Sequence, residues 1–133
     1  MARINLWTVL LQSVLFFSLH HVHAQDLGEG KRIYMTNCAN CHGATGKGDG
    51  PVAKTMPTKP ADHTNGAIMN KETDKFLLDI ISRGGAAVKK SPLMPVWGGH
   101  FNEKQIRDLV AYVRSLAVPP YTEPVKTGEK SGR

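Results

Sequence analysis

The feature that most constrains this chain is the segment Cys38–His42 (CANCH), which contains both of its cysteines. C-x-x-C-H is the pattern of covalent c-type haem attachment. Two thiols three residues apart lie on one side of a helical turn, where both can add to the vinyl groups along one edge of a porphyrin. The imidazole that follows directly can then bind the iron. We therefore predict one haem c, attached through Cys38 and Cys41, with His42 as an axial ligand.

Two other roles for the cysteines need to be weighed. A thioredoxin-like disulfide needs a preceding strand of a βαβ unit, whereas residues 33–37 carry helical periodicity. A structural zinc site needs a fourth ligand, for which His63 and His100 are available. However, the chain has no second C-x-x-C and no H-x3-5-H pair at the usual spacing. Haem attachment is favoured over both.

The first 24 residues have the pattern of an export signal. Arg3 forms a short positive region, residues 4–19 are rich in Leu, Val and Phe, and the small residue Ala24 suits signal peptidase. The apolar run is shorter than the roughly 18 to 20 residues that a spanning helix needs. We predict that residues 1–24 are a cleaved signal peptide, which places the mature chain in the periplasm without a stable membrane span. An uncleaved membrane anchor is the alternative.

The chain is small and basic. It has 17 Lys and Arg against 11 Asp and Glu, a formal net charge of +6. With no cysteine left for a structural disulfide, the mature domain must be stabilised by its core and its cofactor. The charge favours redox proteins with acidic docking surfaces as partners. Nucleic-acid binding is not expected, because no basic stripe interleaves with aromatic residues. We expect a monomer.

Helical periodicity organises the mature chain. The predicted amphipathic helices span about residues 27–38, 73–83 and 102–118. Gly30 within the first helix predicts the close approach of another helix, and Asn102 with Gln105 resembles a capping box at the start of the last one. Residues 25–118 then form one domain, and residues 119–133, with Pro, Gly and mixed charges, form a flexible C-terminal tail.

A six-coordinate iron needs a second axial ligand from beyond the motif. Met94 is the predicted ligand, because it lies in a proline-braced loop, residues 91–99, that can project a side chain onto the distal face of the haem. His63 and His100 are its rivals. The remaining methionines of the mature chain are better suited to packing: Met35, Met56 and Met69.

Several segments outside the C-x-x-C-H motif also match the pattern of a known protein family. They are residues 30–43 (GxxxYxxxCANCHG), 48–51 (GDGP), 59–62 (KPAD), 94–98 (MPVWG) and 109–116 (LVAYVRSL). Together they resemble the class I mono-haem c-type cytochromes. The resemblance implies an all-α cytochrome c fold, with three to five short helices wrapped around one covalently bound haem and the terminal helices crossing beside it. It also implies His42 and Met94 as axial ligands, and a hydrogen bond from His42 Nδ1 to the Pro51 carbonyl.

The function expected from these features is electron transfer, not enzymatic catalysis. We predict a periplasmic one-electron carrier of a respiratory chain, which docks through the haem edge near Cys38, Ala39 and Val52. The lysines expected around that edge are Lys47, Lys54, Lys59, Lys89 and Lys90. One alternative is a dedicated haem subunit of one oxidoreductase complex. Another is a peroxidase or gas-binding haem protein with an open distal site, against which the braced Met94 loop argues.

Overall fold

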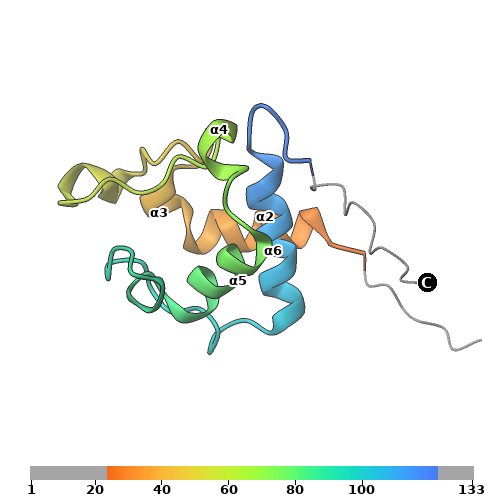
Figure 1. Ribbon diagram of the computed structural model, residues 1–133. Coiled ribbons are helices and arrows are strands. Elements are labelled where there is room, and N and C mark those ends of the chain that lie inside the picture. Colours follow the sequence, from red (N-terminus) through yellow and green to blue (C-terminus); the bar gives the residue numbers. More distant parts are fainter. Residues whose placement is uncertain (1–23, 123–133) are drawn as a thin grey trace, which may run out of the picture.

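The structure, a computed structural model, describes residues 24–122 and is helical (Figure 1). The predicted signal peptide, apart from Ala24, and residues 123–133 of the predicted tail lie outside the described residues. The elements are α2 (Leu27–Asn37), α3 (Ala39–His42), η1 (Pro51–Thr55), α4 (Gly66–Met69), α5 (Asp74–Arg83), η2 (Ala86–Val88) and α6 (Glu103–Ser115). Between residues 24 and 122, β-pairing is limited to one isolated bridge, between Asn65 and Val118. The predicted all-α fold class is confirmed.

Helices α2 and α6 cross in close contact and form the centre of the fold (Figure 1). At Gly30, a Cβ atom would collide with the backbone carbonyl of Asp108 and with Cβ of Tyr112. The expected close approach of a second helix at this glycine is therefore confirmed. Next to the crossing, Ile33 and Tyr34 are completely buried. The tight contact lets apolar side chains of both helices enter one core.

The helix starts follow local capping signals. The Thr73 hydroxyl accepts a hydrogen bond from the Phe76 N–H at 3.1 Å at the start of α5. Asn102 and Gln105 form a complete capping box at the start of α6, as the sequence predicted. The end of α6 does not match the prediction. The helix stops at Ser115 instead of continuing to residue 118. The Val118 N–H is used elsewhere, donating to the Thr64 carbonyl at 2.9 Å.

Residues 118–121, the C-terminal segment, pack along α4. The Val118 carbonyl accepts from the Gly66 N–H at 3.0 Å. The Asn70 amide donates to the carbonyls of Pro119 and Pro120 at 3.1 and 3.3 Å. The beginning of the predicted tail therefore contacts the fold and fastens α4 in place.

A buried arginine joins α6 to the chain between α4 and α5. The Arg114 guanidinium donates to the carbonyls of Met69 and Glu72 and to the Asp74 carboxylate. It also lies over the Tyr121 ring, 3.9 Å from its centre. Because carbonyl groups as well as a carboxylate surround it, this guanidinium fixes the backbone path from α4 into α5.

The two ends of the described chain lie on the same side of the molecule in Figure 1, away from α3. Gln25 and Leu27 share a surface pocket with Pro120 and Tyr121. Between Ala24 and Thr122, the helices are all too short or too polar to span a bilayer.

Candidate haem site

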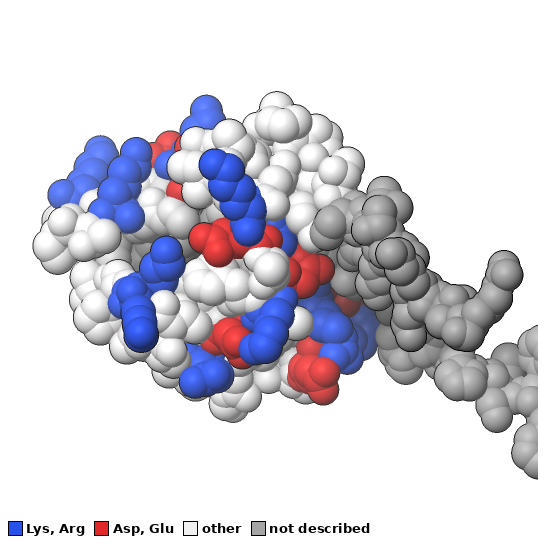
Figure 2. Space-filling model, in the orientation of Figure 1, with Lys and Arg blue, Asp and Glu red and all other residues white. Residues whose placement is uncertain are grey.

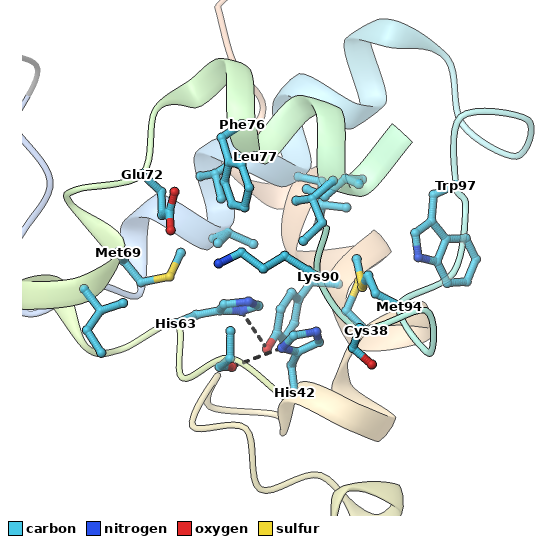
Figure 3. A pocket seen from close by; sticks show the side chains of 18 of the residues that line it. Cys38, His42, His63, Met69, Glu72, Phe76, Leu77, Lys90, Met94 and Trp97 are labelled. Atoms are coloured by element: carbon cyan, nitrogen blue, oxygen red, sulfur yellow. Dashed lines mark hydrogen bonds between the residues drawn. The ribbon is translucent and has the colours of Figure 1, made fainter. Parts of the chain in front are cut away.

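An apolar cavity of ≈ 280 Å³ lies beside the α2–α6 crossing and is lined by residues of both helices (Figure 3). A smaller cavity of ≈ 90 Å³ adjoins it and shares Cys38, His42 and Met94 as lining residues. Cys41 also lines the smaller one. The structure therefore brings all four predicted site residues together around one connected space.

The apolar walls of the larger cavity come from the helices. Amphipathic α5 and α6 each direct one stripe of side chains inward. These wall residues are Phe76, Leu77, Ile80 and Ile81 of α5, and Leu109 and Val113 of α6. Such walls exclude water from whatever the cavity holds.

The cysteines lie at the junction of α2 and α3. The N–H groups of Cys41 and His42 both donate to the Cys38 carbonyl, at 3.1 and 2.9 Å. This single turn directs both thiols and the imidazole toward the same space. Burial, together with the neighbouring Cys41, raises the pKa of Cys38 to about 11. Cys38 is therefore a neutral thiol near neutral pH. A zinc site would require at least three His, Cys, Asp or Glu side chains close enough together to hold the ion. Residues 24–122 contain no such group.

His42 is oriented by a backbone carbonyl. Its Nδ1 lies 3.1 Å from the Ala61 carbonyl oxygen, so Nδ1 carries the proton and Nε2 keeps its lone pair. Burial lowers the pKa of His42, which favours the neutral imidazole that a metal needs.

The prediction that the Pro51 carbonyl accepts the hydrogen bond from His42 Nδ1 was wrong. The stretch after Pro60 passes beside His42, because the His63 N–H donates to the Gly46 carbonyl at 2.6 Å and anchors that stretch. Pro51 instead begins η1, directly after Gly50, whose backbone packs on the carbonyls of Ala39 and Asn40. The path of a loop that is distant in the sequence therefore decides which carbonyl accepts the hydrogen bond from His42.

Met94 reaches the cavity from the segment after η2. Its carbonyl accepts from the Gly85 N–H at 3.1 Å, and its own N–H donates to the Ser91 carbonyl at 3.2 Å. Figure 3 shows the Met94 and His42 side chains directed into the cavity from different segments of the chain. Backbone hydrogen bonds thus hold the Met94 loop, and the thioether itself is left available.

The rivals to Met94 occupy other places. The His63 ring stacks on the His42 ring, with centres 4.3 Å apart and planes 17° from parallel, so it lies on the His42 side of the cavity. Burial, together with the neighbouring His42, lowers the pKa of His63 to about 3. His100 is exposed, with its ring edge-on to Trp97. No local pattern in the sequence could have predicted the pairing of His63 with His42.

A few charged side chains complete the cavity. Lys59, Glu72 and Lys90 line it, and Lys90 Nζ lies 5.7 Å from the centre of the Phe76 ring. A largely apolar space with two free thiols, a neutral imidazole, a thioether and two cationic groups fits a flat apolar macrocycle with anionic substituents. The residues present therefore fit haem c.

The family of the chain follows from comparison with known proteins. The family model for cytochrome c matches residues 27–117, which is nearly all of the described chain. The chain belongs to the cytochrome c family. The resemblance to class I c-type cytochromes is thereby confirmed, and haem c is the cofactor that this family implies.

Individual relatives are of two kinds. The chain is 33% identical over 99 residues to the cbb3-type cytochrome c oxidase subunit CcoP of Azospirillum sp., covering 70% of this chain and 29% of that protein. It is 30% identical over 91 residues to the FixP subunit of Bradyrhizobium diazoefficiens, covering 68% and 28%. Cytochrome c6 of Synechococcus sp. is 29% identical over 90 residues, covering 68% of this chain and 70% of that protein. The chain thus spans less than a third of the two oxidase subunits.

One solved structure shares the architecture. A chain of the Kuenenia stuttgartiensis reducing HAO-like protein complex aligns with a TM-score of 0.55 and 27% identity, covering 71% of this chain and 46% of that chain. This likeness agrees with the cytochrome c fold.

Proposed function

We propose that this chain is a periplasmic one-electron carrier that holds a single haem c. In this proposal Cys38 and Cys41 form the thioether bonds, and His42 and Met94 are the axial ligands. Residues 1–24 are removed on export, and the mature protein is a monomer. The observation that carries the proposal is that these four side chains line two neighbouring, mostly apolar cavities that share Cys38, His42 and Met94.

The residues around the cavity suit electron transfer. The haem supplies an iron that gains and loses one electron without changing its ligands. The Met94 thioether stabilises the ferrous state relative to the ferric state, and the apolar walls disfavour the extra positive charge of the ferric state. Both effects raise the reduction potential, so we expect a positive value. The hydrogen bond to the Ala61 carbonyl restrains one edge of the His42 imidazole, which would help to keep the reorganisation on electron transfer small.

Partners are proposed to dock on the lysine rim, by which we mean Lys47, Lys54, Lys59, Lys89 and Lys90. All five are exposed. Figure 2 shows positively charged side chains on either side of the hollowed face, while acidic ones gather toward the middle and lower right. Val52 and Leu93, 45% and 47% exposed, add apolar surface near the cysteine side. A small interface of this kind attracts acidic redox proteins and releases them quickly.

A second candidate is a dedicated haem subunit of one oxidoreductase complex. The observation that favours it is the set of relatives, because CcoP and FixP are named as subunits of a cbb3-type oxidase and the solved structure belongs to a protein complex. The carrier and the subunit share the same haem site. They differ in whether the chain leaves its partner between electron transfers.

Mass and spectra of the protein purified from its native membrane and soluble fractions test the proposal. The carrier should have the mass of residues 25–133 plus one haem, and its reduced form should not bind carbon monoxide at neutral pH. Rapid carbon monoxide binding would contradict ligation by Met94, and a mass that retains residues 1–24 would contradict cleavage. Stable co-purification with one oxidoreductase would favour the subunit.

A further inference from the structure

We infer that His63 is a positioning residue for the proximal ligand: its ring, stacked face to face on His42, fixes the plane of the His42 imidazole. The inference rests on the proposed role of His42 as an axial ligand. Figure 3 shows the two rings beside one another at the base of the cavity.

Two restraints of different kinds act on His42. The hydrogen bond from Nδ1 to the Ala61 carbonyl, 3.1 Å long, lies in the plane of the ring and holds one edge of it. A single in-plane hydrogen bond tolerates tilting of the ring about that edge. The His63 ring, 4.3 Å away and 17° from parallel, lies against the face of His42 and blocks tilting toward itself. Together they define both the direction and the plane of the imidazole.

His63 is itself held by the core. Its N–H donates to the Gly46 carbonyl at 2.6 Å, which fixes its backbone. Its Nδ1 lies 3.5 Å from the Tyr34 hydroxyl, and the two rings meet edge to face with centres 5.9 Å apart. Tyr34 is completely buried in α2, and its hydroxyl donates to the Gly43 carbonyl at 3.0 Å. The orientation of the proximal ligand is thereby tied to the central helix of the fold.

The flatness of the His63 side chain is what matters in this arrangement. A branched aliphatic side chain would fill a similar volume but would present no plane parallel to His42. An imidazole bound to iron through Nε2 keeps rotation about that bond as its main freedom. The plane of the ring decides which iron orbitals it overlaps, and so the distribution of unpaired spin over the ferric haem. A change in that plane is visible by spectroscopy even when the fold and ligands are unchanged.

The test uses the full chain with haem attached, in the variants His63→Leu and His63→Phe. The phenylalanine ring keeps a flat face, whereas leucine does not. His100→Leu is the matched control, since His100 contacts Trp97 and not His42. For each ferric protein, the haem-methyl NMR shifts and the EPR g values are measured together with the thermal unfolding midpoint. We expect His63→Leu to shift the methyl resonances and g values, and His63→Phe and His100→Leu to keep the wild-type pattern.

Two results would overturn the inference. If His63→Leu keeps the wild-type pattern, His63 only fills space. If His63→Phe and His63→Leu shift the pattern alike, the plane of the side chain is not what matters. His63→Met, also non-planar, replaces the leucine variant if that variant does not fold. A wild-type protein without a low-spin spectrum and a thioether-to-iron band would instead refute the proposed function, before any variant is compared.

Discussion

The α2–α6 crossing and the haem cavity are built in different ways. At the crossing, the chain satisfies its own groups: the Asp26 N–H donates to the buried Asp108 carboxylate at 2.9 Å, and Gly30 lets the two backbones touch. At the cavity, mostly apolar side chains line a space of ≈ 280 Å³ that suits a cofactor. At about 24 cal/mol per Å³, the packing contacts of a cofactor in this volume would contribute about 7 kcal/mol. That amount is comparable to the whole net stability of a small domain, about 5–15 kcal/mol.

Because the two regions are built differently, variants in them should change different measured quantities. A change at the crossing should alter the free energy of unfolding and leave the haem spectrum alone. A change in the cavity should alter the spectrum and the reduction potential. Arg114 connects the two regions, so its loss should affect both.

The largest effect is expected when haem attachment is removed. In the double variant Cys38→Ser/Cys41→Ser, no haem is covalently held, and the stabilisation from filling the cavity is lost. We expect the variant to lack bound haem on a denaturing gel and to lose most of its far-ultraviolet helical signal. A cooperative thermal transition at the wild-type temperature would show that the crossing supports the fold alone.

Met94→Ala should change the proposed haem site and leave the helical fold intact. The haem stays attached through the cysteines, but the sixth ligand is lost. We expect the reduction potential to fall by roughly 0.1–0.3 V and the reduced form to bind carbon monoxide. Redox titration measures the first effect and absorption spectra the second. Met56→Ala, which changes another methionine at the smaller cavity, is the control, and it should change the potential far less, because Met56 is not a proposed ligand.

Arg114→Leu should affect both regions. It leaves the Met69 and Glu72 carbonyls without their donor and removes the partner of Asp74. We expect a loss of about 2–4 kcal/mol in the free energy of unfolding, measured with denaturant, and a changed haem spectrum, since Met69 and Glu72 line the cavity.

A second arginine of α6 provides the control for that measurement. Arg107 pairs with Glu103 on the helix surface. Arg107→Leu should cost under about 1 kcal/mol, because exposed ion pairs contribute little. Equal losses in the Arg107 and Arg114 variants would contradict the special role of the buried guanidinium.

Gly30→Ala should weaken the crossing alone. The added methyl group meets the Asp108 carbonyl, so we expect a loss of about 1–3 kcal/mol in the free energy of unfolding. Gly28→Ala is the matched control, because there the methyl group meets only the Asp26 carboxylate oxygen, at 3.2 Å. The absorption spectrum should be unchanged in both. A shifted spectrum in Gly30→Ala would remove the distinction between the two regions.

The smallest effect concerns acid stability at the crossing. Burial raises the pKa of Asp108, but hydrogen bonds from Lys104 and the Asp26 N–H outweigh it, so the pKa is lowered overall. A carboxyl group with a lowered pKa stabilises the fold above its unfolded value, about 3.9, and loses this contribution as the pH falls through the folded value. Denaturant titrations across that range should show a shallower loss of stability in Asp108→Asn than in the wild type. Equal slopes would contradict this prediction.

Most of the structural features that could be predicted from the sequence depend on local signals. The caps at Thr73 and Asn102 and the close contact at Gly30 depend on neighbouring residues or on one helix face, and the structure has all three. The family was predicted from the C-x-x-C-H motif and the further segments that resemble class I cytochromes, and the all-α class was implied by that resemblance. The roles of His42 and Met94 as ligands stay predictions, although both side chains line one cavity.

Long-range placement accounts for what the sequence could not predict. The acceptor for His42 is 19 residues away, at Ala61 instead of Pro51. Arg114 binds the Met69 carbonyl 45 residues away. Neither contact has a local motif, because any backbone carbonyl can accept a hydrogen bond, and the path of the loops decides which one does. The stacking of His63 on His42 was missed for the same reason.

The position of the two chain ends has a consequence for modular evolution. Both ends of the described chain lie on one side of the fold, away from α3 (Figure 1), which carries two of the residues that line the haem cavities, Cys41 and His42. Additional polypeptide can therefore be joined at either end of the described chain without covering the face on which we propose that partners dock. A unit with this geometry can form part of a longer protein, and its likeness to less than a third of CcoP and FixP fits such a use.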